Sequence, residues 1–182
     1  MTRLKNIFVS TTFAKDDSKI SDVLAACKKE NISNVELGSN HIYEKNFKKI
    51  IQQYNFRFLV HNYFPIPRKS FVVNIASLNK QIRTISIQHV KKAINFCKVT
   101  NSKLYTVHPG FLADPITASR TKNNYDFIWN NNNLNQNYNS AFNYMLSSLK
   151  KIVHFAKYKK VRVAIETEGS FKKKKFIINA KT

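Results

Sequence analysis

The chain has 182 residues, of which 43% are hydrophobic, so it is long enough to form one domain, residues 1–182, around a buried core. No stretch approaches the ~18 consecutive apolar residues of a membrane span, which excludes a transmembrane protein. The 31 basic and 10 acidic residues leave a formal net charge of +21, a value typical of proteins that bind nucleic acid or anionic membranes. A bias toward A- and T-rich codons would also produce this charge, because Lys greatly outnumbers Arg and both Asn and Ile are abundant.

The two cysteines and the start of the chain indicate the compartment. Cys27 and Cys97 both fall in helical patterns, where a free thiol behaves as a small buried hydrophobic group. A disulfide framework is not indicated, and a reducing cytoplasm is the natural setting. The apolar stretch from Ile7 to Val9 is too short for a signal peptide. We therefore expect a soluble, cytoplasmic protein without membrane partners.

Strand-like and helical stretches alternate along the chain. Apolar runs predict strands at residues 7–13, 34–38, 56–63, 103–108 and 161–167. Between them, apolar residues at helical spacing predict helices at residues 18–31, 43–55, 78–100 and 139–159. Ser18 or Asp17 is expected to cap the first helix, and Asn79 the third. Most strand runs are continuously apolar, which predicts strands covered on both faces by helices.

This alternation predicts an α/β fold with a parallel sheet and right-handed crossovers, either doubly wound or a (β/α) barrel. The segment after the first strand, "VSTTFAKDD", has no glycine, which argues against a nucleotide-binding phosphate loop. Two connections are unusually long, residues 64–77 and 111–136, and both leave the carboxyl ends of strands. The second contains Trp129 in a biased Asn-rich tract, which is either a mobile lid or a disordered insertion.

Three predicted strands end in a potential metal ligand: His61, His108 and Glu166. Because all strands of a parallel barrel point the same way, these side chains are expected to meet around one mouth. Two imidazoles and a carboxylate suit zinc, manganese or a similar divalent ion. Glu36 ends the second strand at the same rim, and Glu168 would face inward with Glu166 if the fifth strand continued that far.

Structural roles compete with each of these assignments. A single histidine at a strand end is commonly a hydrogen-bonded structural residue, and Glu36 could pair with a lysine. Asn62 and Asn74 could cap loops rather than bind substrate. We expect structural roles for the remaining three histidines and a solvated turn for residues 172–175; those histidines are His41, His89 and His154.

At the strand ends, the sequence resembles the xylose isomerase-like barrel superfamily, which contains sugar isomerases and epimerases and the endonuclease IV-type enzymes that cut DNA at abasic sites. The most specific segments are "VHNYFP" with the following "VVNIAS", then "VHPGF", then "AIETEGS". In the nuclease branch, similar segments supply two histidines and a glutamate as zinc ligands, which implies that role for His61, His108 and Glu166. In the epimerase branch the residue matching Glu166 is both metal ligand and acid/base.

The resemblance implies a metal-dependent sugar or sugar-phosphate isomerase or epimerase, with Glu36, Asn62 and Glu168 near the substrate. The nuclease branch usually has a histidine and paired glycines after the first strand, where this chain has "FVSTTFAKDD", and "VELGS" is more similar to the isomerases. A nuclease that acts on DNA is therefore the alternative, and a noncatalytic remnant is a third possibility.

Members of this superfamily have eight strands, whereas five are predicted here. We therefore expect a partial (β/α)8 TIM barrel with about five parallel strands and four or five helices. The remaining metal ligands of such a barrel come from its last three strands. The resemblance thus implies weak retention of Mn or Zn, little activity from this stretch alone, and open sheet edges that invite self-association.

Overall fold

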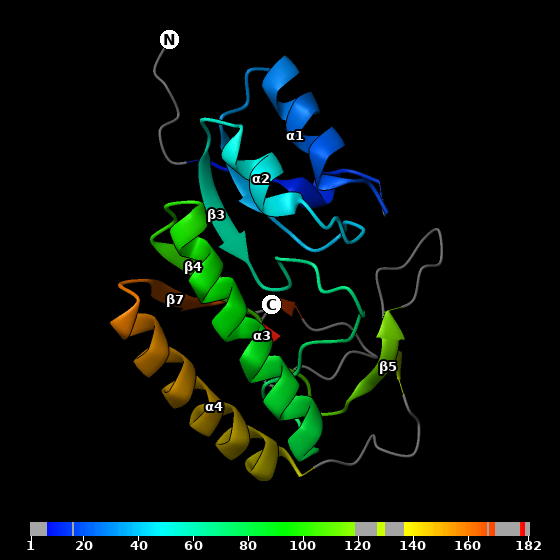
Figure 1. Cartoon of the computed structure of the whole chain (residues 1–182). Coiled ribbons are helices and arrows are strands. Elements are labelled where there is room, and N and C mark those ends of the chain that lie inside the picture. Colours follow the sequence, from blue (N-terminus) through cyan, green and yellow to red (C-terminus); the bar gives the residue numbers. More distant parts are fainter. Residues whose placement is uncertain are drawn as a thin grey trace. The chain divides into compact units, whose positions relative to one another are not determined.

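The central feature is a five-stranded sheet in the order β1-β2-β3-β4-β7, seen in a computed structural model (Figure 1). The structure describes residues 7–15, 17–118, 127–129, 137–166, 168–169 and 179–180. Neighbouring strands pair in parallel from β1 to β4. The strands of the sheet are β1 (Val9–Ser10), β2 (Asn34–Leu37), β3 (Arg57–His61), β4 (Leu104–Val107) and β7 (Arg162–Ile165).

Four helices join these strands, so the predicted α/β alternation and the partial barrel are confirmed. The helices are α1 (Ile20–Lys29), α2 (Phe47–Gln52), α3 (Lys80–Val99) and α4 (Tyr138–Tyr158). Asn79 caps α3 as expected, because its side-chain oxygen accepts hydrogen bonds from the backbone N–H groups of Gln81 and Ile82 at 2.8 and 3.3 Å. Cys27 and Cys97 are free and buried in helices, as the sequence indicated.

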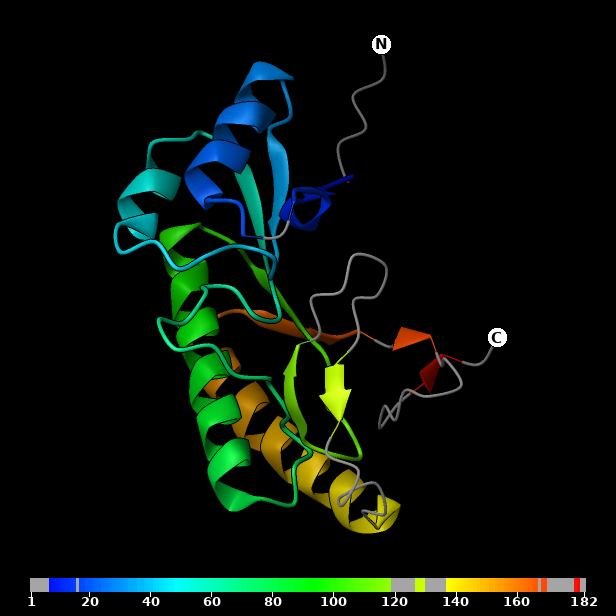
Figure 2. The ribbon, with the colours of Figure 1, turned by 90° about the vertical axis from the view of Figure 1, so that its right-hand side faces the viewer.

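The chain divides into two compact units. The first consists of Met1–Lys69, Lys92–Thr106 and Ala156–Ala164, and thus contains β1, β2, β3, α1 and α2. The second consists of Ser70–Lys91, Val107–Phe155 and Ile165–Thr182. Within the first unit, α1 and α2 cover one side of β2 and β3 (Figures 1 and 2). An aromatic cluster of Phe47, Phe64 and Phe96 packs in that unit, with ring centroids 5.4 to 5.9 Å apart.

Burial alternates along the strands, which corrects the prediction that helices cover both faces. On β3 and β4, Val60 and its pairing partner Tyr105 are fully buried, whereas the next pair, His61 and Thr106, is only half-buried. On β2, Val35 and Leu37 are buried and Glu36 between them is half-buried. Successive side chains of a strand point to opposite faces, so along β2, β3 and β4 one face is buried and the other is partly open.

The first strand and the first cap differ from the expectation. Residues Thr11–Phe13 form a 3-10 helix instead of continuing β1. This turn puts the Thr11 hydroxyl where it accepts the N–H of Gly38 and contacts His41. The N-cap of α1 is Lys19, which makes no side-chain cap bond. The Glu44 carboxylate takes the place of a cap, because it accepts the backbone N–H of Ser21 at 3.1 Å.

In the second unit, the segment after β3 is buried rather than a surface loop. Val73, Asn74, Ile75, Ala76 and Ser77 are each at most 5% exposed. The Ser148 hydroxyl of α4 donates to the Ile75 carbonyl at 2.8 Å, and the N–H of Asn74 donates to the Ser86 hydroxyl of α3 at 2.9 Å. Both helices therefore hold this segment in place.

Part of the second long connection forms an antiparallel pair, β5 (Pro115–Ala118) with β6 (Phe127–Trp129), seen as the two yellow-green arrows near the middle of Figure 2. This pair replaces the alternative of an entirely irregular insertion for those residues. A second small pair joins β8 (Glu168–Gly169) to β9 (Asn179–Ala180). The lysine run at 172–175, predicted as a solvated turn, lies outside the described residues.

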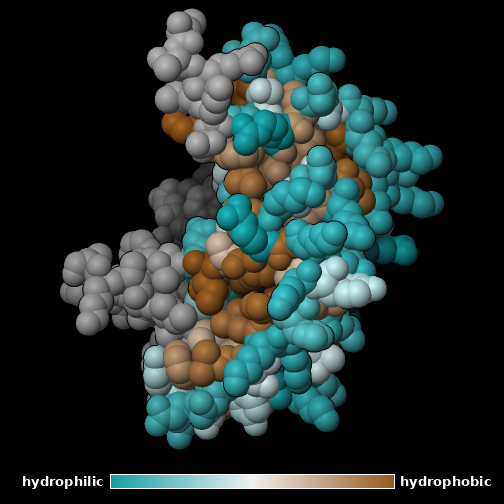
Figure 3. Space-filling model, turned by 90° about the vertical axis from the view of Figure 1, so that its left-hand side faces the viewer, coloured by the Kyte–Doolittle hydropathy of each residue, from teal (hydrophilic) through white to brown (hydrophobic). Residues whose placement is uncertain are grey.

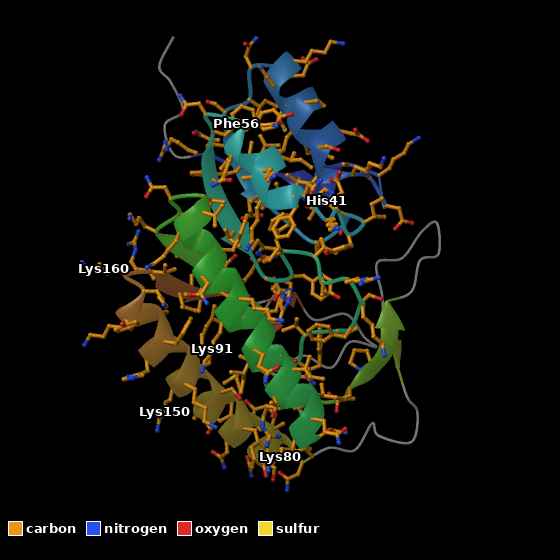
Figure 4. The ribbon with its side chains drawn as sticks, in the orientation of Figure 1. His41, Phe56, Lys80, Lys91, Lys150 and Lys160 are labelled. Carbon is orange, nitrogen blue, oxygen red and sulfur yellow. The ribbon has the colours of Figure 1, made fainter. Side chains whose placement is uncertain are left out.

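The surface is mixed in character. Hydrophobic and hydrophilic side chains interleave on the face shown in Figure 3, and α3 and α4 leave Ile85 and Val153 about half exposed, at 49% and 51%. Lys80, Lys150 and Lys160, labelled in Figure 4, are exposed. Among the described residues, no helix is both long and apolar enough to cross a membrane.

His41 makes the stability of the first unit depend on pH. Its ring is 6% exposed, with Nδ1 3.3 Å from the Ser18 carbonyl and Nε2 2.8 Å from the Thr11 hydroxyl. A carbonyl can only accept, so Nδ1 carries the proton and the Thr11 hydroxyl donates to Nε2. Burial lowers the pKa of His41 below its usual 6.5, although the Ser18 hydrogen bond and the Glu44 charge partly oppose the shift.

Because the folded pKa is lowered, the unfolded chain takes up a proton more readily than the folded chain below about pH 6.5. The contribution of His41 to the free energy of unfolding should therefore be fully retained above that pH and fall as the pH decreases below it. Chemical denaturation of wild type and His41→Gln above and below that pH checks it, with the exposed His154→Gln as the matched control. An unchanged pH slope in His41→Gln would contradict the assignment.

Candidate metal centre

His61 is the last residue of β3, and its orientation is set by the neighbouring strand. It pairs with Thr106 of β4, and its Nδ1 lies 2.6 Å from the Thr106 hydroxyl. Because Nδ1 is engaged there, the ring would bind a metal ion through Nε2.

The backbone after His61 is fixed from β4 as well. The N–H of Asn62 donates to the Thr106 carbonyl, and the Tyr105 hydroxyl donates to the Asn62 carbonyl, both at 2.7 Å. Tyr105 is fully buried, and burial raises its pKa, so the phenol stays protonated as this bond requires. Asn62 itself has a φ of 36°, a conformation that asparagine tolerates better than most residues. The structure thus gives Asn62 a backbone role, and its predicted contact with substrate stays a prediction.

His108 directly follows β4, and a tight turn follows it. The ring is half-buried and its Nε2 atom is buried. Pro109, Gly110 and Phe111 are buried, and Gly110 has a φ of 109°, which only glycine adopts readily. The sharp change of direction predicted after this strand is therefore present.

Glu166 lies one residue beyond β7. Its N–H donates to the carbonyl of Val107 at 3.0 Å, which places it beside the residue that precedes His108. Its side chain is exposed. A carboxylate that is anchored through its backbone and open to solvent can reach an incoming molecule.

The structure brings together the three ligands predicted from the sequence. One ligand atom each from His61, His108 and Glu166 can be chosen so that all three lie within 4.8 Å of one another. The register explains this result. His61 pairs with Thr106, and His108 lies two residues after Thr106, just beyond the end of β4. The Glu166 N–H is hydrogen-bonded to the carbonyl of Val107, which lies between Thr106 and His108.

The donor set fits a divalent transition metal. Nitrogen and oxygen ligands lie about 2.0–2.2 Å from a tetrahedral zinc ion, so its donors are about 3.4 Å apart. The three donor atoms here lie within 4.8 Å of one another, so side-chain rotations would have to bring them about 1 Å or more closer together. Two neutral imidazoles and one carboxylate are also a ligand combination found in catalytic zinc sites.

The other predicted site residues stand apart from this group. Glu36 pairs with Leu59 on the same half-open face of the sheet as His61, but it does not belong to the ligand group. Glu168 lies in β8 rather than in an extended β7, which ends at Ile165, so the condition for its inward orientation is not met. The position of its side chain lies outside what the structure describes.

Two of the three remaining histidines, His41 and His89, have the structural roles expected of them. His41 is hydrogen-bonded inside the first unit (Figure 4). His89 is 5% exposed and meets the Phe71 ring edge-on with centroids 5.6 Å apart. His154 is exposed on α4. A small hollow is lined by Ile20 and His41 among others, but includes none of the three ligands.

Sequence reasoning missed Thr106, the partner of His61. The alternation of side chains along a strand pointed to it in principle, because a residue two positions before His108 faces the same side of the sheet. Identifying it also required the register between β3 and β4, which the sequence pattern alone does not define.

Comparison with known proteins agrees with this architecture. Among solved structures, a D-tagatose 3-epimerase-like protein shares 18% identity, with a TM-score of 0.63 over 90% of this chain and 53% of its own. An L-ribulose 3-epimerase shares 11%, with a TM-score of 0.58 over 88% of this chain and 49% of its own. A D-allulose 3-epimerase from Methylomonas sp., in complex with D-allulose, shares 11% identity, with a TM-score of 0.58 over 93% of this chain and 52% of its own.

The chain therefore spans about half the length of these structures. At such low sequence identity, the similarity shows a shared fold. No match was found among curated proteins. The sequence model of the family described as Xylose isomerase-like TIM barrel matches residues 13–176, which is most of the chain. On this match and the parallel β/α architecture, the chain belongs to the xylose isomerase-like TIM barrel family.

Proposed function

We propose that this chain supplies part of the active site of a divalent-metal-dependent isomerase or epimerase that acts on a sugar or sugar phosphate. The observation that carries the proposal is the convergence of His61, His108 and Glu166 on one ligand group. These residues follow adjacent strands at their carboxyl ends, the face on which TIM-barrel enzymes carry out their chemistry.

The substrate class follows from the structural relatives. They are epimerases by description, and one contains D-allulose. The half-open face of the sheet that carries Glu36 and His61 offers polar groups suited to hydroxyl-rich molecules. We therefore assign a ketose, free or phosphorylated, as the substrate.

In the proposed reaction, Glu166 removes a carbon-bound proton next to the substrate carbonyl. A divalent ion, when bound, would polarise the substrate carbonyl as a Lewis acid and so acidify that proton. Glu166 is suited to the task because its backbone is anchored to Val107 while its carboxylate is open to solvent. His61 and His108 would hold the ion through ring nitrogens, and Thr106 keeps the His61 ring in one orientation.

The donor set favours zinc over manganese. Imidazole nitrogens suit zinc, whereas manganese prefers carboxylates, carbonyls and water. Manganese stays the second choice, because a carboxylate is one of the three donors.

Zinc binding is the first test of the proposal. Isothermal titration should show binding of one Zn²⁺ per chain. Loss of a group that only orients a ligand costs about 10–100-fold in metal affinity, and His108→Ala, which removes a ligand itself, should cost more. The matched control is His154→Ala, which removes an exposed histidine of α4 and should bind as wild type does. Equal affinity in wild type and His108→Ala would contradict the site.

Proton abstraction can be measured without a complete epimerisation. In ²H₂O, metal-loaded protein should exchange the proton next to the carbonyl of a ketose, followed by NMR, and Glu166→Gln should slow the exchange by about 10²–10⁴-fold. Exchange that persists in Glu166→Gln would refute the assigned base. Incision of an abasic-site duplex, with no ketose exchange, would favour the nuclease instead.

Thr106→Val provides a test of the orientation of His61. The variant keeps the shape of the side chain but loses the hydroxyl at Nδ1, so the affinity for Zn²⁺ should fall by about 10–100-fold. Thr100→Val is the matched control, because the Thr100 hydroxyl donates to the Cys97 carbonyl at the end of α3. If both variants bind zinc as tightly as wild type does, Thr106 has no role in the site.

A further inference from the structure

Asn74 is a fully buried polar residue in the segment between β3 and α3, at 0% exposure. A buried amide is stable only when its donors and acceptors are satisfied. All of its side-chain partners described below belong to its own segment or to the stretch that follows His108.

The Asn74 side chain forms a clamp on the turn after β4. Its Oδ1 accepts the backbone N–H of Phe111 at 3.0 Å and that of Ala76 at 3.1 Å. Its Nδ2 donates to Asp114 Oδ1 at 2.8 Å, to the Phe111 carbonyl at 3.2 Å and, more weakly, to the Ala113 carbonyl at 3.5 Å. Two backbone donors on the oxygen and only acceptors around the nitrogen leave a single consistent orientation of the amide.

The backbone that carries the Asn74 side chain is itself held by hydrogen bonds to α3 and α4. The N–H of Asn74 donates to the Ser86 hydroxyl of α3, and the carbonyl of the next residue, Ile75, accepts the Ser148 hydroxyl of α4. On the far side, the Ser77 hydroxyl donates to Asp114 Oδ2 at 2.7 Å. Both carboxylate oxygens of Asp114 are therefore held by the segment that carries Asn74.

Gly110 shows how closely the turn packs on this amide. A Cβ placed on Gly110 would lie 2.5 Å from Asn74 Oδ1 and 3.0 Å from the Ala76 Cβ. Together with the φ of 109°, this contact requires glycine at the position. The turn at Gly110 therefore packs directly against the Asn74 amide.

We propose that Asn74 is the positioning residue for His108. His108 stands between two fixed points, the end of β4 at Val107 and the clamped Phe111, with only Pro109 and Gly110 between. Holding both sides of so short a segment confines its backbone, and thereby the imidazole, to one orientation. The functional reading rests on the proposed metal site, whereas the positioning itself is a property of the metal-free chain.

The charge distribution of the clamp permits a rescue experiment. Asn74→Asp removes the amide donor and sets a second carboxylate against Asp114, which should open the turn. Adding Asp114→Asn restores a donor opposite an acceptor at this contact. Asn79→Ala is the matched control, because it removes another asparagine of the same segment whose side chain caps α3 and does not touch the turn.

The first readout is the His108 ring in the metal-free protein, followed by heteronuclear NMR. Wild type and Asn79→Ala should give one sharp set of ring signals. Asn74→Asp should give broadened or shifted signals. The double variant should move part of the way back to the wild-type pattern, because the carboxylate at position 74 still cannot donate to the Phe111 carbonyl as the amide does. Unchanged ring signals in a folded Asn74→Asp, or a double variant no closer to wild type than Asn74→Asp is, would overturn the proposal. Should Asn74→Asp not fold, a folded double variant with ring signals near those of wild type supports the proposal, and one without them overturns it.

Zinc affinity is the second readout and separates the two proposals. Asn74→Asp should lower the affinity by about 10–100-fold, and the double variant should recover part of that loss. If wild type binds no zinc while the ring signals respond as described, the metal site fails and the positioning stands. If zinc binds equally in all variants and the ring signals do not change, the positioning role is wrong.

Discussion

The parallel register of β3, β4 and β7 is the constraint on which the candidate site depends. His61 on β3 pairs with Thr106, and the N–H of Glu166 after β7 donates to the Val107 carbonyl. The ends of β3 and β7 are therefore both aligned with the end of β4. Side chains alternate along a strand, so a slip of one residue in either pair would turn a ligand to the other face of the sheet. The buried pair Val60 and Tyr105, directly before His61 and Thr106, makes such a slip costly because it would expose apolar surface.

Because of this alternation, one face of the strands carries the apolar core residues and the other carries the polar candidate site residues. The fully buried side chains, such as Val35, Val60 and Val107, supply hydrophobic stabilisation. The half-buried face carries Glu36, His61 and His108, which would be poor choices for a closed core. In this chain, the arrangement places polar side chains on one face of the strands, supported by apolar packing on the other.

Much of this architecture was predictable, because periodicity and strand ends are local signals. Alternating elements predicted the parallel sheet, and three strand ends predicted His61, His108 and Glu166. The parts that were not predictable depend on contacts between residues far apart in the sequence. Glu44 takes over the role of a cap for α1 from 23 positions away, and Asn74 reaches Phe111 across 37. The turn at Thr11 likewise depends on Gly38, which no pattern near Thr11 indicates.

The account stands on His61, His108 and Glu166 sharing one ion. X-ray absorption spectroscopy of the zinc-loaded protein measures that coordination most directly. The account predicts two imidazole ligands and oxygen ligands at about 2.0–2.2 Å from the metal. A spectrum without imidazole scattering, or one unchanged when His61 and His108 are both replaced by alanine, would contradict it.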